Sequence, residues 1–83
     1  MSTKIYVGNL PYTVLDAELH DQFSRYGQVG SAKVMMDRDT GRSKGFGFVE
    51  MGDDEQARQA IAGLDGVQVA GRALKVNEAR PRV

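Results

Sequence analysis

The order of the apolar patterns along this chain constrains its fold more than any other feature. Short runs rich in β-branched and aromatic residues are interleaved with two stretches in which apolar residues recur every three or four places. The order is strand, helix, strand, strand, helix, strand, which predicts an α+β split sandwich. In this βαββαβ arrangement one four-stranded antiparallel sheet carries two helices on one face. A chain of 83 residues has little left to cover the other face, which is therefore open for binding.

The strand boundaries follow from the turn residues that separate the apolar runs. The predicted strands are residues 4–8, 29–36, 44–51, 67–69 and 74–76. The last two are expected to pair around Ala70-Gly71, and the final one closes the domain. The predicted domain spans residues 1–80, and residues 81–83 form a flexible tail.

The two helices, with their caps, are predicted over residues 13–26 and 53–65. Thr13 is the expected N-cap of the first helix, with the carboxylate of Asp16 reaching back to it. Asp53 is expected to open the second helix in a similar way. The residues expected to face the sheet are Leu15, Leu19 and Phe23 in the first helix and Ala57, Ala60, Ile61 and Leu64 in the second.

The composition excludes several kinds of site. Cysteine is absent, which removes disulfides, thiolate catalysis and every sulfur-based metal site. The only histidine, His20, cannot form a multi-histidine metal centre on its own. No apolar run approaches the ~20 residues that a membrane span needs. We therefore predict no catalytic group, no metal, no cofactor and no membrane, and a cytoplasmic location, or a nuclear one in a eukaryote.

The strand over residues 44–51 decides what the open face presents. Successive side chains of a strand point to opposite faces. One face of this strand holds Lys44, Phe46, Phe48 and Glu50, and the other holds Gly45, Gly47, Val49 and Met51. The second set suits the helices, because it is apolar and its glycines permit close approach. The two phenylalanines are therefore predicted to point outward.

The first strand adds a third ring to the open face. Ile5 and Val7 are its natural core pair, which directs Tyr6 outward. An alternative places both phenylalanines in the core, the usual position for that residue. It would expose the valine and methionine of the same strand, so we prefer the outward rings.

Flat rings on a rigid open sheet suit the stacking of unpaired bases. Each such stack contributes ~1–3 kcal/mol and tolerates every base, because every base has a π-face. A duplex offers no free base faces. The rings therefore predict a single-stranded nucleic acid as the ligand.

The charges are divided between the helices and the rest of the chain although they cancel overall. The 11 basic and 11 acidic residues give no net charge, but the two helical segments hold seven acidic residues and only two basic ones. The sheet, loops and tail hold the remaining excess of basic groups, which can meet phosphates. An alternative is that these charges are ordinary solvated surface and helix capping. The basic residues predicted to hold a phosphate backbone are Lys4, Lys33, Lys44, Arg42 and Arg80.

Two segments resemble the RNA recognition motif family, whose octapeptide is K/R-G-F/Y-G/A-F-V-x-F/Y. Lys44-Gly45-Phe46-Gly47-Phe48-Val49-Glu50-Met51 agrees at seven of the eight places, counting the free one. About forty residues earlier, Ile5-Tyr6-Val7-Gly8-Asn9-Leu10 is similar to the family's hexapeptide. The likeness covers nearly the whole chain, and the chain resembles small single-domain bacterial and plant glycine-rich RNA-binding proteins.

The resemblance implies a ferredoxin-like fold and a non-catalytic protein that binds single-stranded RNA. It implies that Tyr6 and Phe48 stack on bases. It also implies that Phe46 packs on a sugar and that Lys44 contacts a phosphate. Met51 departs from the motif, where an aromatic residue is expected, and the change should affect packing because this position faces the helices. The positions at which family members often make polar base contacts correspond to Asn77, Ala79 and Arg80.

Two other function classes and one other ligand are weighed against this prediction. The same fold carries acylphosphatase-like hydrolases, but their chemistry needs a phosphate-cradling loop with an arginine, which Gly8-Asn9-Leu10-Pro11 lacks. A domain that holds a peptide through its helices, or through its aromatic face, is the stronger rival. Such domains typically lose the sheet aromatics, and this chain keeps all three. Single-stranded DNA is a weaker alternative ligand, since the preference for RNA comes from the resemblance alone.

Overall fold

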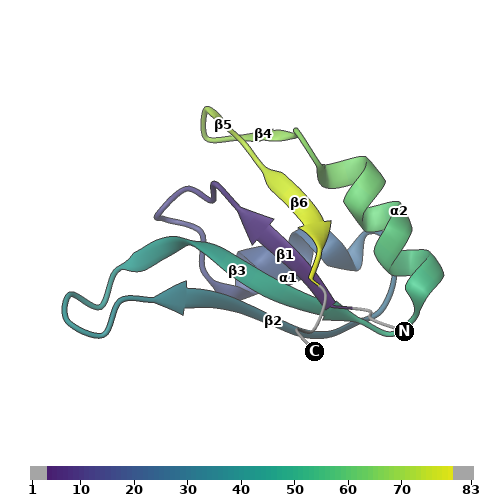
Figure 1. Cartoon of the computed structure of the whole chain (residues 1–83), viewed down its shortest axis with the longest axis horizontal. Helices are drawn as coiled ribbons and strands as arrows, with labels where there is room; N and C mark the ends of the chain where they lie inside the picture. Colours follow the sequence, from purple (N-terminus) through teal and green to yellow (C-terminus); the bar gives the residue numbers. More distant parts are fainter. Residues whose placement is uncertain (1–3, 80–83) are drawn as a thin grey trace.

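The computed structural model describes residues 4–79, and it has one antiparallel sheet with two helices on the same face (Figure 1). In chain order the elements are β1 (Lys4–Gly8), α1 (Asp16–Ser24), β2 (Val29–Met36), β3 (Ser43–Met51), α2 (Asp54–Leu64), β4 (Gln68–Val69), β5 (Arg72–Ala73) and β6 (Lys75–Glu78). The sheet order is β2-β3-β1-β6, and β4 and β5 form a separate hairpin. The predicted βαββαβ fold is confirmed. The predicted domain end at residue 80 and the tail at 81–83 lie outside the described residues.

The core lies between the sheet and the two helices. Strand alternation sends every second side chain towards the helices, so Ile5 and Val7 of β1 are fully buried. Helix α1 packs on β2 and β3, and α2 packs on β6, β3 and β1. From the helices and the other strands the core receives Leu19, Phe23, Val34, Val49, Met51, Ala57, Ala60, Leu64 and Val76.

Gly47 allows β2 and α1 to approach β3 closely. A Cβ atom at this position would lie 2.5 Å from the carbonyl oxygen of Lys33 and 3.2 Å from Cδ2 of Leu19. The first contact is too short and involves backbone that cannot move freely, and the second is tight. Together with the burial of Val49 and Met51, this confirms that the glycine-containing face of β3 is the one that faces the helices.

The first helix begins later than predicted, and the predicted capping by Thr13 is wrong. Helix α1 starts at Asp16, and its N-cap is Leu15, which has an extended backbone and makes no side-chain cap. Leu15 therefore precedes the helical repeat and is 51% exposed, not part of the core. The carboxylate of Asp16 turns to the sheet, where Oδ1 accepts the backbone N–H of Val34 at 2.7 Å. The second helix begins as predicted, with Asp53 as its N-cap.

We expect Asp16→Ala to lower the free energy of unfolding by about 1–3 kcal/mol, because it leaves the part-buried N–H of Val34 without its acceptor. Urea unfolding followed by circular dichroism measures the change. Thr13→Ala is the control, and it should cost less than ~0.5 kcal/mol because Thr13 provides no cap. An equal loss of unfolding free energy in the two variants would indicate that Thr13 does cap the first helix.

The C-terminal strands differ from their predicted boundaries. Gln68–Val69 pairs with Arg72–Ala73 across a two-residue turn in which both Ala70 and Gly71 have positive φ, at 52° and 80°. Positive φ at both central residues is the requirement of a type I′ hairpin. The predicted strand at 74–76 is therefore divided: Leu74 ends the hairpin, and β6 begins at Lys75 and pairs with β1.

Candidate functional site

Three aromatic rings form one cluster on the open face of the sheet. Tyr6 comes from β1, and Phe46 and Phe48 come from β3. The ring centroids are 5.9 Å apart for Tyr6–Phe46, 5.8 Å for Tyr6–Phe48 and 6.1 Å for Phe46–Phe48. These separations are those of mutually packed rings. Each ring is half-buried, because the rings shield one another while neither of the two helices in the described part of the chain covers this face (Figure 1).

A row of four residues crosses the whole sheet through this three-ring cluster. Phe48 lies opposite Tyr6 on one side and Lys33 on the other, and Tyr6 lies opposite Asn77. Directly opposed residues in an antiparallel sheet have Cα atoms ~4.5–5.5 Å apart. The fold thus brings Lys33, Phe48, Tyr6 and Asn77 into one continuous line from β2 to β6.

Cationic side chains lie around this row. The Nζ atom of Lys4 is 5.4 Å from the centroid of the Phe48 ring, within the range of a cation–π contact. Lys33 and Lys44 are exposed on the strands. Arg42 is exposed in the loop between β2 and β3, directly before the first residue of β3. Four of the five basic residues predicted from sequence are therefore exposed on β1, β2, β3 or the loop that leads into β3.

The last predicted positions lie at the edge strand β6. Asn77 is exposed within the row. Ala79 donates its backbone N–H to the carbonyl oxygen of Lys4 at 2.9 Å, which continues the pairing of β6 with β1 by one step. Arg80, the remaining predicted basic residue, lies outside the described residues.

Gly8 holds space for the Tyr6 ring. These two residues of β1 point to the same face, and a Cβ atom at Gly8 would lie 2.7 Å from the hydroxyl oxygen of Tyr6 and 2.9 Å from its Cε2. The ring therefore lies along the strand over the glycine. Any side chain at Gly8 forces the ring to move, and the cluster with it.

We expect Gly8→Ala to weaken nucleic-acid binding while it changes the free energy of unfolding by less than ~1 kcal/mol. The added methyl group meets the free end of the Tyr6 side chain, which can swing away. The aromatic proton shifts of the rings and the affinity for a single-stranded oligonucleotide report the two effects. Gly52→Ala is the matched control, because a Cβ there meets nothing closer than 3.6 Å. Unchanged ring shifts in Gly8→Ala would contradict this role.

Sequence reasoning missed an exposed aromatic residue beside the predicted site. Tyr12 is 61% exposed, and the guanidinium carbon of Arg72 lies 5.1 Å from its ring centroid. Arg72 also donates to Oδ1 of Asn9 at 3.3 Å. With Leu15 and Met36, both exposed, Tyr12 lines a groove that reaches Lys44. The available signal was an aromatic residue directly after a proline in a loop, where exposed binding residues concentrate.

The electrostatic field differs between the two sides of the sheet. The first turns of α1 and α2 carry acidic residues, Asp16 and Glu18 in α1 and Asp54 and Glu55 in α2. The open face carries the lysines described above. In residues 4–79 there is no group of three or more histidine, cysteine, aspartate or glutamate side chains that could hold a metal ion. Over the same range, no helix has the length and apolar character needed to cross a membrane.

The model of the RNA recognition motif family matches residues 5–75, which include all three rings of the cluster. The chain belongs to the RNA recognition motif family. Its relatives within this family include the putative RNA-binding protein RbpB of Nostoc sp., which is 53% identical over 78 residues and covers 94% of this chain and 76% of its own length. The confirmed fold is the one that this family shares.

Two further members of the family differ in how much of their own length this chain matches. A chloroplastic 28 kDa ribonucleoprotein of Spinacia oleracea is 52% identical over 83 residues, and the match covers 98% of this chain but only 36% of the spinach protein. Among solved structures, the Rna15 RRM with bound RNA (GU) superimposes with a TM-score of 0.88 at 36% identity, over 98% of this chain and 86% of that one. The chain therefore spans about a third of the chloroplast relative.

Proposed function

We propose that this protein binds single-stranded RNA across the open face of its sheet and catalyses no reaction. The three-ring cluster carries the proposal: Tyr6, Phe46 and Phe48 are packed together on the face of the sheet opposite to α1 and α2 (Figure 1). About two to four nucleotides fit such a platform. Tyr6 and Phe48 each stack on a base, and Phe46 packs against a ribose.

The surrounding polar groups fix the strand and orient it. Lys4, Lys33, Lys44 and Arg42 meet phosphates, and Arg80 is proposed to join them. Asn77 and the backbone around Ala79 contact base edges at the β6 side. Two stacks of ~1–3 kcal/mol, reduced by the cost of ordering the RNA, predict modest affinity for a single domain.

The names of the relatives support this assignment. RbpB is called an RNA-binding protein, the spinach relative is a ribonucleoprotein, and the Rna15 structure contains bound RNA. The chain has no cysteine and one histidine, so a non-catalytic role agrees with its composition. We further propose that single-stranded DNA binds more weakly and that the protein acts in the cytoplasm.

Titration of isotopically labelled protein with random single-stranded RNA octamers tests the proposal. We expect backbone amide shifts at Tyr6, at residues 44–50 and at Asn77. If about three phosphates are contacted, the logarithm of the affinity falls with that of the salt concentration with a slope of about −2. Raising salt from 50 to 200 mM then weakens binding about twentyfold.

A duplex RNA of the same length and a DNA octamer pool are the controls. The duplex should bind at least tenfold more weakly, because its bases have no free faces. The absence of shifts on the open face would overturn the proposal and favour a protein partner on the helices. Equal binding of the duplex would overturn base stacking as its mechanism.

A further inference from the structure

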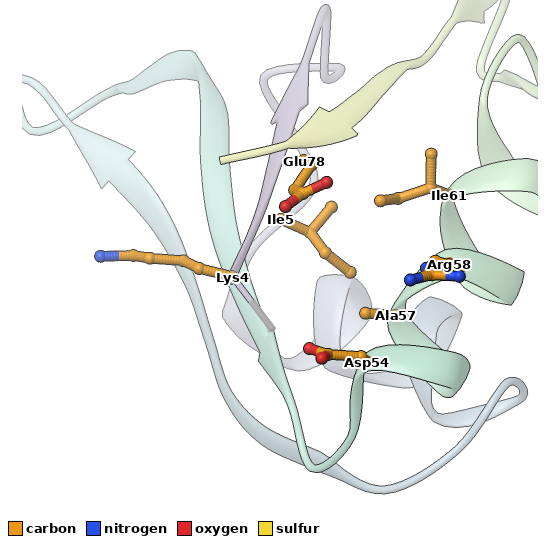
Figure 2. Close-up of a pocket in the computed structure, with 7 residues that line it drawn as sticks. All are labelled: Lys4, Ile5, Asp54, Ala57, Arg58, Ile61 and Glu78. Carbon is orange, nitrogen blue, oxygen red and sulfur yellow. The ribbon is translucent and has the colours of Figure 1, made fainter. Parts of the chain in front are cut away.

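A small pocket lies on the helix side of the sheet, where β1 begins and β6 ends (Figure 2). Its volume is about 130 Å³. Ile5 of β1 and Ala57 and Ile61 of α2 form its apolar part. Ile5 points to the opposite side of the sheet from Tyr6. The pocket and the three-ring cluster therefore lie on different faces of the same sheet.

Two carboxylates border the apolar part of this pocket. Asp54 belongs to the first turn of α2, and Glu78 ends β6; Figure 2 shows both side chains directed to the space beside Ile5. The Oδ1 atom of Asp54 is buried and has no hydrogen-bond partner among residues 4–79. A carboxylate oxygen that has lost water without gaining a donor is in an unfavourable state. A donor that entered the pocket would relieve it.

Two cationic residues, Lys4 and Arg58, also line the pocket. The side chain of Lys4 leads away from the pocket in Figure 2, and its ammonium group contacts the Phe48 ring on the open face. Arg58 lies on the exposed surface of α2, and among the described residues it forms no ion pair with Asp54 or Glu78. The two carboxylates thus share the lining with Arg58 and with the apolar residues Ile5, Ala57 and Ile61.

This chemistry fits an organic cation better than a metal ion. Two carboxylates are fewer ligands than a dedicated metal site uses, and an apolar base gives nothing to a hydrated ion. A long cationic side chain suits both parts, because its methylene stem packs on apolar groups while its head stays polar. The planar guanidinium of arginine also presents several donors at once, so it can serve two carboxylates. A volume of 130 Å³ is close to the ~150 Å³ that admits a benzene ring, so one side chain enters.

We propose that this pocket binds an arginine side chain of a partner polypeptide. The acidic start of α2, where Asp53, Asp54 and Glu55 follow one another, attracts a basic segment and repels RNA phosphates. The partner and the RNA use opposite faces of the sheet. Both are therefore bound at the same time, and the protein links an RNA strand to a second polypeptide.

A peptide with one arginine between glycine and serine residues, Gly-Ser-Gly-Arg-Gly-Ser-Gly with blocked ends, serves as the probe. We expect its titration into labelled protein to produce saturable amide shifts at Ile5, Asp54, Ala57 and Glu78. The same peptide with citrulline, which is uncharged, should bind about tenfold more weakly, because the charge-assisted hydrogen bonds are lost. Shifts that centre on the three-ring cluster, or equal affinity for the citrulline peptide, would overturn the proposal.

Two variants that each remove one negative charge from the start of α2 test whether the peptide binds in the pocket. Asp54→Asn should weaken the arginine peptide about tenfold, whereas Glu55→Gln, one residue further along α2 and outside the pocket, should leave its affinity unchanged. Glu78→Gln tests the other wall without touching the helix, and it should weaken binding as well. An equal loss of peptide affinity in the Asp54 and Glu55 variants would show only general electrostatic attraction to the acidic start of α2, and it would overturn the proposal that the pocket binds arginine. Phe48→Ala should leave peptide binding unchanged, so a failure of the RNA proposal is measured separately.

Discussion

Phe48→Ala should weaken binding of single-stranded RNA about 5- to 150-fold, which corresponds to the loss of one stack of ~1–3 kcal/mol. Phe48 occupies the centre of the row that crosses the sheet, with Tyr6 on one side and Lys33 on the other. It also provides the ring that Lys4 contacts. Removal of the ring therefore takes away a base platform and loosens a cation that we expect to hold a phosphate.

The same substitution should change the fold little. The ring is half-buried among other surface rings and not among the helices, so we expect a loss of about 1 kcal/mol in the free energy of unfolding. Fluorescence anisotropy with a labelled RNA octamer and urea unfolding measure the two quantities. A large loss in the free energy of unfolding with RNA binding unchanged would mean that Phe48 faces the helices and not the open side of the sheet.

Phe23→Ala should lower the free energy of unfolding more than any of the other substitutions, while it leaves the affinity for RNA unchanged. Phe23 of α1 is fully buried and is among the largest side chains of the core. Truncation of such a ring leaves a cavity and typically costs ~3–5 kcal/mol. Domains of this kind have total stabilities of only ~5–15 kcal/mol, so the variant should be close to unfolded at 37 °C.

Thermal unfolding by circular dichroism measures this effect, and Phe48→Ala is its matched control because the same residue type is truncated on the other side of the sheet. RNA affinity of the Phe23 variant, measured at a temperature where it is folded, should equal that of the unmodified protein. A loss of less than ~1 kcal/mol would show that the helix repacks into the space and that the core is less rigid than its burial indicates.

Strand alternation is the reason that much of the fold and the site could be predicted from sequence. It placed Tyr6, Phe46 and Phe48 on one face, and the structure shows them there in one cluster. Periodicity likewise identified the buried residues Leu19 and Phe23 of α1. These patterns depend only on which side of an element a residue occupies, and this is decided locally.

The errors occurred where a distant contact overrides a local preference. Asp16 bonds the backbone of Val34, 18 residues away, instead of capping its own helix. Tyr12 and Arg72 meet across 60 residues of sequence, so no local pattern reports their contact. The pocket at Asp54 also depends on where β6 ends beside α2. Such features need the three-dimensional arrangement, because neighbouring residues in the sequence say nothing about them.

The row Lys33, Phe48, Tyr6 and Asn77 takes one residue from each strand of the main sheet. A partly unfolded chain that has released either edge strand thus lacks one end of the row. If RNA binds along this row as proposed, only the fully folded protein binds it, and RNA binding and cooperative folding are linked equilibria. RNA at 100 times its Kd would raise the free energy of unfolding by about 2.7 kcal/mol. Bound RNA would thus stabilise the four-stranded sheet against the release of an edge strand.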